Sequence, residues 1–130
     1  MIAVDTNILV RYFLGEEEDA ETERAVRLIE NELSSEAQGF VSAITLCEII
    51  WVLRNRYGFG KAAQVAVVRL MIESVQLNIE HDDCAISALD CGHPDIADAI
   101  IHFVGAKRGC AKTITFDRKF ARLKGVELLQ

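Results

Sequence analysis

Short apolar runs alternate along this chain with longer segments of helical periodicity, and this alternation constrains the fold more than any other feature. The runs that predict strands cover residues 2–5, 40–42, 77–80, 113–116 and 126–129. The segments that predict helices begin at Thr6 and continue over 16–36, 44–57, 61–75, 82–90 and about 95–107, with a short basic helix after Asp117. Because hairpin signals are few, successive strands must be joined through helices, which favours parallel pairing. We therefore expect an α/β fold with a parallel sheet covered on both faces.

Length and composition predict one globular domain over residues 1–130. A chain of 130 residues with 51% hydrophobic and 26% charged residues can bury a substantial core. No apolar run approaches the roughly 18 residues that a membrane-spanning helix needs. The N-terminal stretch has no basic residue before Asp5, unlike a signal peptide, so we expect a cytoplasmic protein. The cysteines lack C-x-x-C spacing, which predicts free thiols acting as small core residues at Cys47, Cys84, Cys91 and Cys110.

The charged residues are unevenly distributed, although the net charge is only −6. Between Gly15 and Ala37 nine acids and two bases give a local charge of −7. Between Lys107 and Lys124 seven bases and one acid give a local charge of +6. A basic segment beside an acidic site suits a polyanionic substrate, whereas the plainer alternative is a solvated charged face.

Two aspartates stand where predicted strands end. Asp5 closes the first run, and Asp117 closes the run T-I-T-F-D. In open α/β sheets the working crevice lies outside the carboxyl ends of the strands, so both acids are candidates for a functional site. The alternative for each is a helix N-cap, a common role for Asp directly after a strand.

Glu48 is the most informative acid, because its neighbours at helical spacing are mostly apolar. Ile44, Thr45, Trp51 and Val52 lie three or four residues away, and the nearest base is Arg54. An ionised carboxylate on such a stripe costs several kcal/mol unless it is paired or bound to a cation. A distant arginine partner or a side chain that escapes at the helix edge are the alternatives.

The segment P-D-I-A-D-A-I-I-H supplies further candidates. Asp95, Asp98 and His102 are spaced by three and four residues, so they share one helix face. Asp95 is also a favourable acid for the first turn, where the helix dipole attracts negative charge. For His102 an intramolecular hydrogen bond or plain exposure is favoured over a ligand role.

Together these acids predict a metal site. Asp5, Glu48, Asp98 and Asp117 would repel one another strongly if they met without a cation, and Mg²⁺ or Mn²⁺ prefers carboxylate oxygens. Such an ion can activate a water molecule toward a phosphodiester bond. No serine–histidine–aspartate order, phosphate-binding glycine loop or cysteine nucleophile competes with this scheme.

The sequence resembles the PIN-domain ribonucleases, and within them the VapC-type toxins of bacterial toxin–antitoxin pairs. Four motifs in order carry the resemblance: V-D-T-N-I-L-V-R-Y at 4–12, L-C-E-I-I-W-V-L-R-N-R-Y-G at 46–58, D-I-A-D-A-I-I at 95–101 and T-F-D-R-K-F-A-R-L-K-G-V at 115–126. The resemblance implies a PIN-like three-layer sandwich with a central, mainly parallel sheet. It also implies a divalent-metal-dependent endoribonuclease, a homodimer, and an antitoxin whose C-terminal segment occupies the groove. One departure is the short C-G-H-P turn before the third motif, which leaves the acids in place.

The resemblance also implies roles for single residues. Asp5, Glu48, Asp98 and Asp117 match the four acidic metal ligands. The supporting residues that it implies are Thr6 and Asn7, which orient Asp5 or the phosphate, Asp95 as an auxiliary acid, and Thr115 as a hydrogen-bond partner of a ligand carboxylate.

Two other functions compete with the nuclease. The first is a module of the same fold that binds RNA or a partner protein with little or no nuclease activity, although the presence of all four acids counts against it. The second is a phosphoacceptor receiver domain, which needs an acidic pair after its first strand and a central Asp. Here Asp5 stands alone, and no Asp lies between Asp19 and Asp82.

Overall fold

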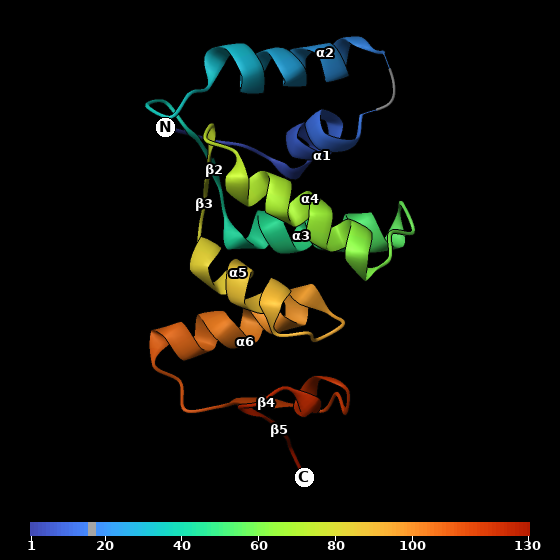
Figure 1. Cartoon of the computed structure of the whole chain (residues 1–130), viewed down its shortest axis with the longest axis vertical. Coiled ribbons are helices and arrows are strands. Elements are labelled where there is room, and N and C mark those ends of the chain that lie inside the picture. Colours follow the sequence, from blue (N-terminus) through green and yellow to red (C-terminus); the bar gives the residue numbers. More distant parts are fainter. Residues whose placement is uncertain (16–17) are drawn as a thin grey trace. The chain divides into compact units, whose positions relative to one another are not determined.

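The computed structural model describes residues 1–15 and 18–130 and divides the chain into two compact units, Met1–Glu80 and His81–Gln130. Each unit combines helices with a parallel sheet, so the predicted α/β class with parallel strands and flanking helices is confirmed (Figure 1). Among the described helices, none combines the length and apolar character that crossing a bilayer demands.

The first unit is built on three parallel strands in the order β1-β2-β3. Ile2 pairs with Gly39, and Gly39 in turn pairs with Leu77. Its elements are β1 (Ile2–Ala3), α1 (Thr6–Leu14), α2 (Ala20–Arg27), the π-helical turn η1 (Leu28–Glu32), β2 (Gly39–Val41), α3 (Ala43–Asn55), α4 (Lys61–Glu73) and β3 (Leu77–Ile79). The central strand β2 contributes Val41 to the core, whereas the edge strand β1 is exposed, with Ile2 at 51%. The first strand is therefore shorter and less buried than the predicted run 2–5: β1 ends at Ala3, and burial begins at Val4, which is 5% exposed.

The helices of the first unit begin close to the predicted positions. Ser42 caps α3 by accepting a hydrogen bond from the backbone N–H of Thr45. The predicted acidic helix over 16–36 begins at residues outside the described range. In its described part, helix covers only α2 and η1, with Ala25 and Ile29 buried, so the predicted helical end at 36 was wrong by four residues.

Helix α4 buries a different face from the one that its most apolar side chains suggest. The residue type of Leu70 favours burial, but its side chain is 57% exposed. The buried positions recur every three or four residues, as one face of a helix requires. They are Gln64, Val67, Val68 and Met71. Gln64 is buried because its amide donates a hydrogen bond to the carbonyl of Phe59.

The second unit packs two helices side by side and adds a two-stranded parallel sheet (Figure 1). Its elements are α5 (Asp82–Asp90), α6 (Ile96–Arg108), β4 (Thr113–Thr115), the 3₁₀ turn η2 (Phe120–Arg122) and β5 (Val126–Leu128). Gly109 ends α6 in the left-handed conformation that favours glycine, at φ 101°. The core lies mainly between α5 and α6, with Ala85, Ala88 and Ile96 fully buried.

The cysteines are free thiols, as predicted, but they are not all core residues. Cys84 is buried, and burial raises the pKa of its thiol. Cys110 lies exposed after the end of α6, so its expected core position was wrong. Its apolar neighbours in the sequence belong to the loop before β4 rather than to a buried element.

Candidate functional site

The carboxyl ends of the three parallel strands of the first unit form the edge from which its candidate residues arise. Asp5 follows β1, Ser42 follows β2 and Glu80 follows β3. Glu80 was not singled out from the sequence, although it closes a predicted strand just as Asp5 does. Its Oε1 accepts a hydrogen bond of 2.9 Å from the backbone N–H of Ala43, so its carboxylate stabilises the start of α3.

Asp5 occupies the N-cap position of α1 but does not use its carboxylate as a cap. Its backbone is extended, at φ −81° and ψ 160°, and its side chain accepts no hydrogen bond from the first turn. The alternative explanation of Asp5 as a capping residue is therefore wrong. The side chain is exposed, and it forms no ion pair with any residue in the described ranges.

Thr6 connects α1 to Glu48 across 42 positions of sequence. Its hydroxyl, 5% exposed, donates a hydrogen bond to Oε1 of Glu48 on α3. The structure thus brings together two of the residues that the sequence singled out, Thr6 and Glu48, beside Asp5. The hydrogen bond fixes one oxygen of the Glu48 carboxylate, and no ion pair to Glu48 occurs within the part of the chain that the structure describes.

The apolar stripe around Glu48 is not buried as expected. Glu48 is exposed, and its helical neighbours Ile44 and Trp51 are 81% and 45% exposed. Helix α3 instead buries Leu46, Ile49, Ile50 and Leu53 on its opposite side. The desolvation cost that suggested a functional role for Glu48 is therefore absent. The hydrogen bond from Thr6 is what fixes the position of its carboxylate.

A pocket of about 670 Å³ opens beside Thr6 and Asn7 in the first unit. Asn7 is exposed on the first turn of α1. The remaining walls combine aromatic, aliphatic and charged side chains from α1, α2 and the end of α3. They include Arg11, Phe13, Glu21, Val52, Arg56, Tyr57 and Phe59.

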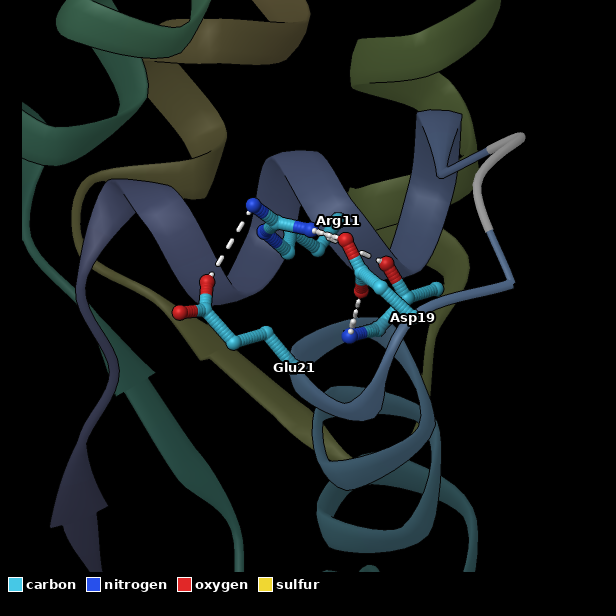
Figure 2. Close-up of polar contacts among 4 residues, drawn as sticks. Arg11, Asp19 and Glu21 are labelled. Carbon is cyan, nitrogen blue, oxygen red and sulfur yellow. Dashed lines mark hydrogen bonds and ion pairs between the residues drawn. The ribbon is translucent and has the colours of Figure 1, made fainter.

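Acids from α2 neutralise Arg11 in the wall of this pocket. Its guanidinium lies 2.5 Å from Oδ2 of Asp19 and 3.1 Å from Oε2 of Glu21 (Figure 2). Hydrogen bonds from Thr22 in the first turn of α2, and then from Arg11, lower the pKa of Asp19 to about 2. Asp19 therefore stays ionised in the folded state well below the usual range of an aspartate.

In the second unit, Asp95 and Asp98 meet at the start of α6. Asp95 is the N-cap, one position before the first turn in which it was predicted, and its Oδ1 accepts a 3.0 Å hydrogen bond from the backbone N–H of Asp98. Both side chains are half-buried. His102 lies further along α6 and is buried, with Nδ1 2.8 Å from the hydroxyl of Thr113. The favoured intramolecular role of His102 is thus confirmed.

Asp117 closes the turn that follows β4. Its Oδ1 accepts hydrogen bonds from the backbone N–H groups of Lys119 and Phe120, at 2.8 and 3.2 Å. The capping alternative therefore holds for Asp117. Thr115 was expected to bond a ligand carboxylate, but its hydroxyl accepts a 3.0 Å hydrogen bond from the backbone N–H of Asp117. The side chain of Thr115 therefore holds the backbone of Asp117 and not its carboxylate.

The structure therefore groups the predicted residues within each unit, Thr6 with Glu48 and Asp95 with Asp98, while the joint action of all four acids stays a prediction. The residues fit a hard divalent cation, because Asp5 and Glu48 offer carboxylate oxygens without a cationic partner among the described residues.

Another cluster of candidate metal ligands was missed from the sequence because its members are not spaced as a known motif. One ligand atom each of His81, Asp83 and Cys84 lie within 4.8 Å of one another. The ammonium group of Lys107 already supplies a cation there, 3.0 Å from Oδ1 of Asp83 and 3.3 Å from Nδ1 of His81. The bond to Asp83 raises the pKa of Lys107, which keeps that charge in place.

The sequence matches the PIN domain family over residues 2–126. No curated protein matched the sequence. Among solved structures, the chain is similar to the crystal structure of VapC20 from Mycobacterium tuberculosis, a sarcin–ricin loop cleaving toxin, with 25% identity and a TM-score of 0.44. That alignment covers 94% of this chain and 94% of VapC20. Because the family match extends over nearly the whole sequence, the chain belongs to the PIN-domain family.

Proposed function

We propose that this chain is a divalent-metal-dependent endoribonuclease and the toxin of a type II toxin–antitoxin pair. Membership of the PIN-domain family supports the proposal. The observation that carries it is the arrangement at the start of α1. There Thr6 holds Glu48, and the neighbouring carboxylate of Asp5 is left out of helix capping. A carboxylate that neither caps a helix nor pairs with a described cation is available to a metal ion.

In this proposal Asp5, Glu48, Asp98 and Asp117 hold one or two ions through their carboxylate oxygens. Mg²⁺ or Mn²⁺ held there would lower the pKa of a bound water and stabilise negative charge on the phosphodiester. Thr6 acts as a positioning residue, since its hydroxyl orients Glu48. The supporting residues are Asn7, which borders the same edge, Thr115, which positions the main chain of Asp117, and Asp95, which positions Asp98 through the cap of α6.

The remaining parts of the proposal concern organisation and partners. Residues 1–130 act as one nuclease domain, and the protein works in the cytoplasm as a homodimer. A cognate antitoxin inhibits it by covering the active groove. The basic segment from Lys107 to Lys124 supports an RNA substrate, because its positive charge can attract the phosphate backbone.

An experiment on RNA cleavage tests the function. The purified full-length chain should cleave RNA with Mg²⁺ or Mn²⁺ and stop when EDTA is added, while its circular dichroism spectrum stays unchanged. Asp98→Asn should reduce cleavage to background and leave the fold intact. Glu73→Gln is the matched control, because Glu73 is an exposed acid at the end of α4 that borders neither candidate pocket.

The competing function is an RNA-binding or partner-binding module without nuclease activity. Cleavage that persists in EDTA would contradict the metal, and cleavage by Asp98→Asn at the parental rate would contradict the ligand assignment. RNA binding without any cleavage at saturating metal would favour the binding module. Loss of fold in EDTA would instead assign the metal a structural role.

A further inference from the structure

A pocket in the second unit is lined by none of the acids assigned to the metal. It has a volume of about 400 Å³ and lies between the loop that joins α5 to α6 and the turn after β4. One wall is the loop 91–94, and the other contains Lys119, Arg122 and Leu123. The lining residues, all of which belong to the described part of the chain, include two cationic side chains and no acid.

A ring contact holds the two walls of this pocket together. The ring of His93 packs against the ring of Phe120, with centroids 5.6 Å apart and an angle of 33° between the planes. Both residues are 6% exposed. Because Phe120 lies between Lys119 and Arg122 in the chain, this contact keeps both cationic residues at the loop. The capping bonds from Lys119 and Phe120 to Asp117 fix the start of the same turn.

Two basic residues of the second unit pair with acids, whereas the cations of this pocket pair with none in the described ranges. Lys107 pairs with Asp83 at 3.0 Å, and Lys112 pairs with Glu127 at 2.8 Å. Neither Lys119 nor Arg122 forms an ion pair with any residue that the structure describes. The pocket therefore gathers two positive charges that the described protein groups do not neutralise, which selects an anionic ligand.

We infer that this pocket binds a phosphodiester of the RNA strand next to the bond that is cleaved, an inference that rests on the proposed function. The planar guanidinium of Arg122 can donate two parallel hydrogen bonds to phosphate oxygens, and Lys119 adds a point charge. Asp117, a proposed metal ligand, precedes Lys119 by two residues and is bonded to its main chain. One turn thus carries both a ligand of the reaction centre and a group that grips the neighbouring phosphate. Such a contact sets the register of the strand without reading its bases.

The test measures RNA binding separately from cleavage. A short fluorescent single-stranded RNA is titrated with the full-length chain in EDTA, at several salt concentrations. We expect Arg122→Gln and Lys119→Gln each to weaken binding about tenfold, as the loss of a charged hydrogen bond implies. The double variant should lower the slope of log K against log salt by about 0.7, the value for one phosphate contact on a single strand.

Lys124→Gln is the matched control, because Lys124 is an exposed base of the same segment that does not line the pocket. An effect of Lys124→Gln equal to that of Arg122→Gln would overturn the inference, since binding would then be spread over the basic face. Unchanged affinity in both pocket variants would overturn it as well. Full displacement of the RNA by inorganic phosphate at a concentration too low to change the ionic strength would identify a small-anion site instead of an RNA site.

Cleavage assays keep this inference distinct from the proposed function. If both hold, Arg122→Gln raises KM about tenfold and leaves kcat at saturating RNA nearly unchanged, because the contact positions the strand. A parental chain that binds RNA through the pocket but never cleaves it would contradict the nuclease and retain the phosphate site. Cleavage with an unchanged KM in both pocket variants would retain the nuclease and reject the phosphate site.

Discussion

Asp5 in the first unit and Asp117 in the second both follow a parallel strand, but they use their carboxylates differently. Asp117 accepts two backbone hydrogen bonds through Oδ1 and closes the turn that leads to η2. Asp5 stands at the start of a longer helix and gives its carboxylate to no backbone donor of that helix. The residue that follows Asp5, Thr6, donates its hydroxyl hydrogen bond to the carboxylate of Glu48.

The difference shows that an acid after a strand can serve structure, function or both. Asp117 has a structural role that would explain its presence even without a metal ion. Asp5 has no such role within the described residues, so its carboxylate is the better evidence for a binding site. Substitutions that remove the charge of a side chain, or its hydrogen bonds, test this difference between Asp5 and Asp117.

The largest effect is expected at Asp5. Asp5→Asn keeps the shape of the side chain and removes the charge that the cation needs, so RNA cleavage should fall to background. Its free energy of unfolding should stay within about 0.5 kcal/mol of the parental value, because no capping bond is lost. Activity is measured with saturating Mg²⁺, and stability by urea unfolding in EDTA. Parental cleavage by this variant would remove Asp5 from the site.

A smaller loss of activity is expected at Thr6. Thr6→Val removes the hydroxyl that holds Glu48 while keeping the shape of the buried side chain, so metal-dependent cleavage should fall roughly 10–100-fold. Thr6→Ser retains the hydroxyl and should recover most of this loss. The Mg²⁺ concentration for half-maximal activity should rise in the valine variant. Equal activity of the valine and serine variants would show that the hydroxyl does not position Glu48.

The stability of three alanine variants compares the capping roles directly. Asp95→Ala and Asp117→Ala each remove an acceptor of backbone hydrogen bonds and should lower the free energy of unfolding by about 0.5–2 kcal/mol. Asp5→Ala should change it by less than about 0.5 kcal/mol. Urea unfolding at neutral pH in EDTA measures all three. A large loss in Asp5→Ala, or none in Asp117→Ala, would reverse the contrast between the two strand ends.

The smallest effect is expected in acid, at Asp19. Its folded-state pKa of about 2 lies below the usual 3.8, so its contribution to stability is present above the usual value and is lost as the pH falls toward 2. Asp19→Asn should therefore flatten the decline of stability between these two pH values. Unfolding midpoints at a series of acidic pH values measure the slope. Parallel curves for the variant and the parental chain would show that Asp19 does not contribute.

The sequence alone predicted most element positions, because amphipathic spacing and capping residues act locally. Helix α5 was expected at 82–90 and lies at Asp82–Asp90. Burial was less predictable, since it depends on which face meets another element. Leu70 and the neighbours of Glu48 are exposed for this reason, although their residue types favour burial.

The candidate site residues also divide into those that local sequence could identify and those that depend on contacts between distant residues. Asp5 and Glu48 were identified from their places in the sequence, Asp5 at the end of a predicted strand and Glu48 among apolar neighbours. Glu80 was passed over, although it follows a strand in the same way and accepts a hydrogen bond from the first residue of α3. Its partner lies 37 positions away in sequence, and no local pattern indicates such a bond.

The order of strands and helices, the parallel connections and the family follow from local periodicity and short motifs, so the sequence was enough to predict them. The use of each acid became visible only in the folded chain: the carboxylate of Asp117 closes a turn, that of Glu48 accepts a bond from a threonine 42 positions away, and that of Asp5 stays outside the helix cap. A hydrogen bond depends on distance and direction in space, and packing sets these between residues that lie far apart in the sequence.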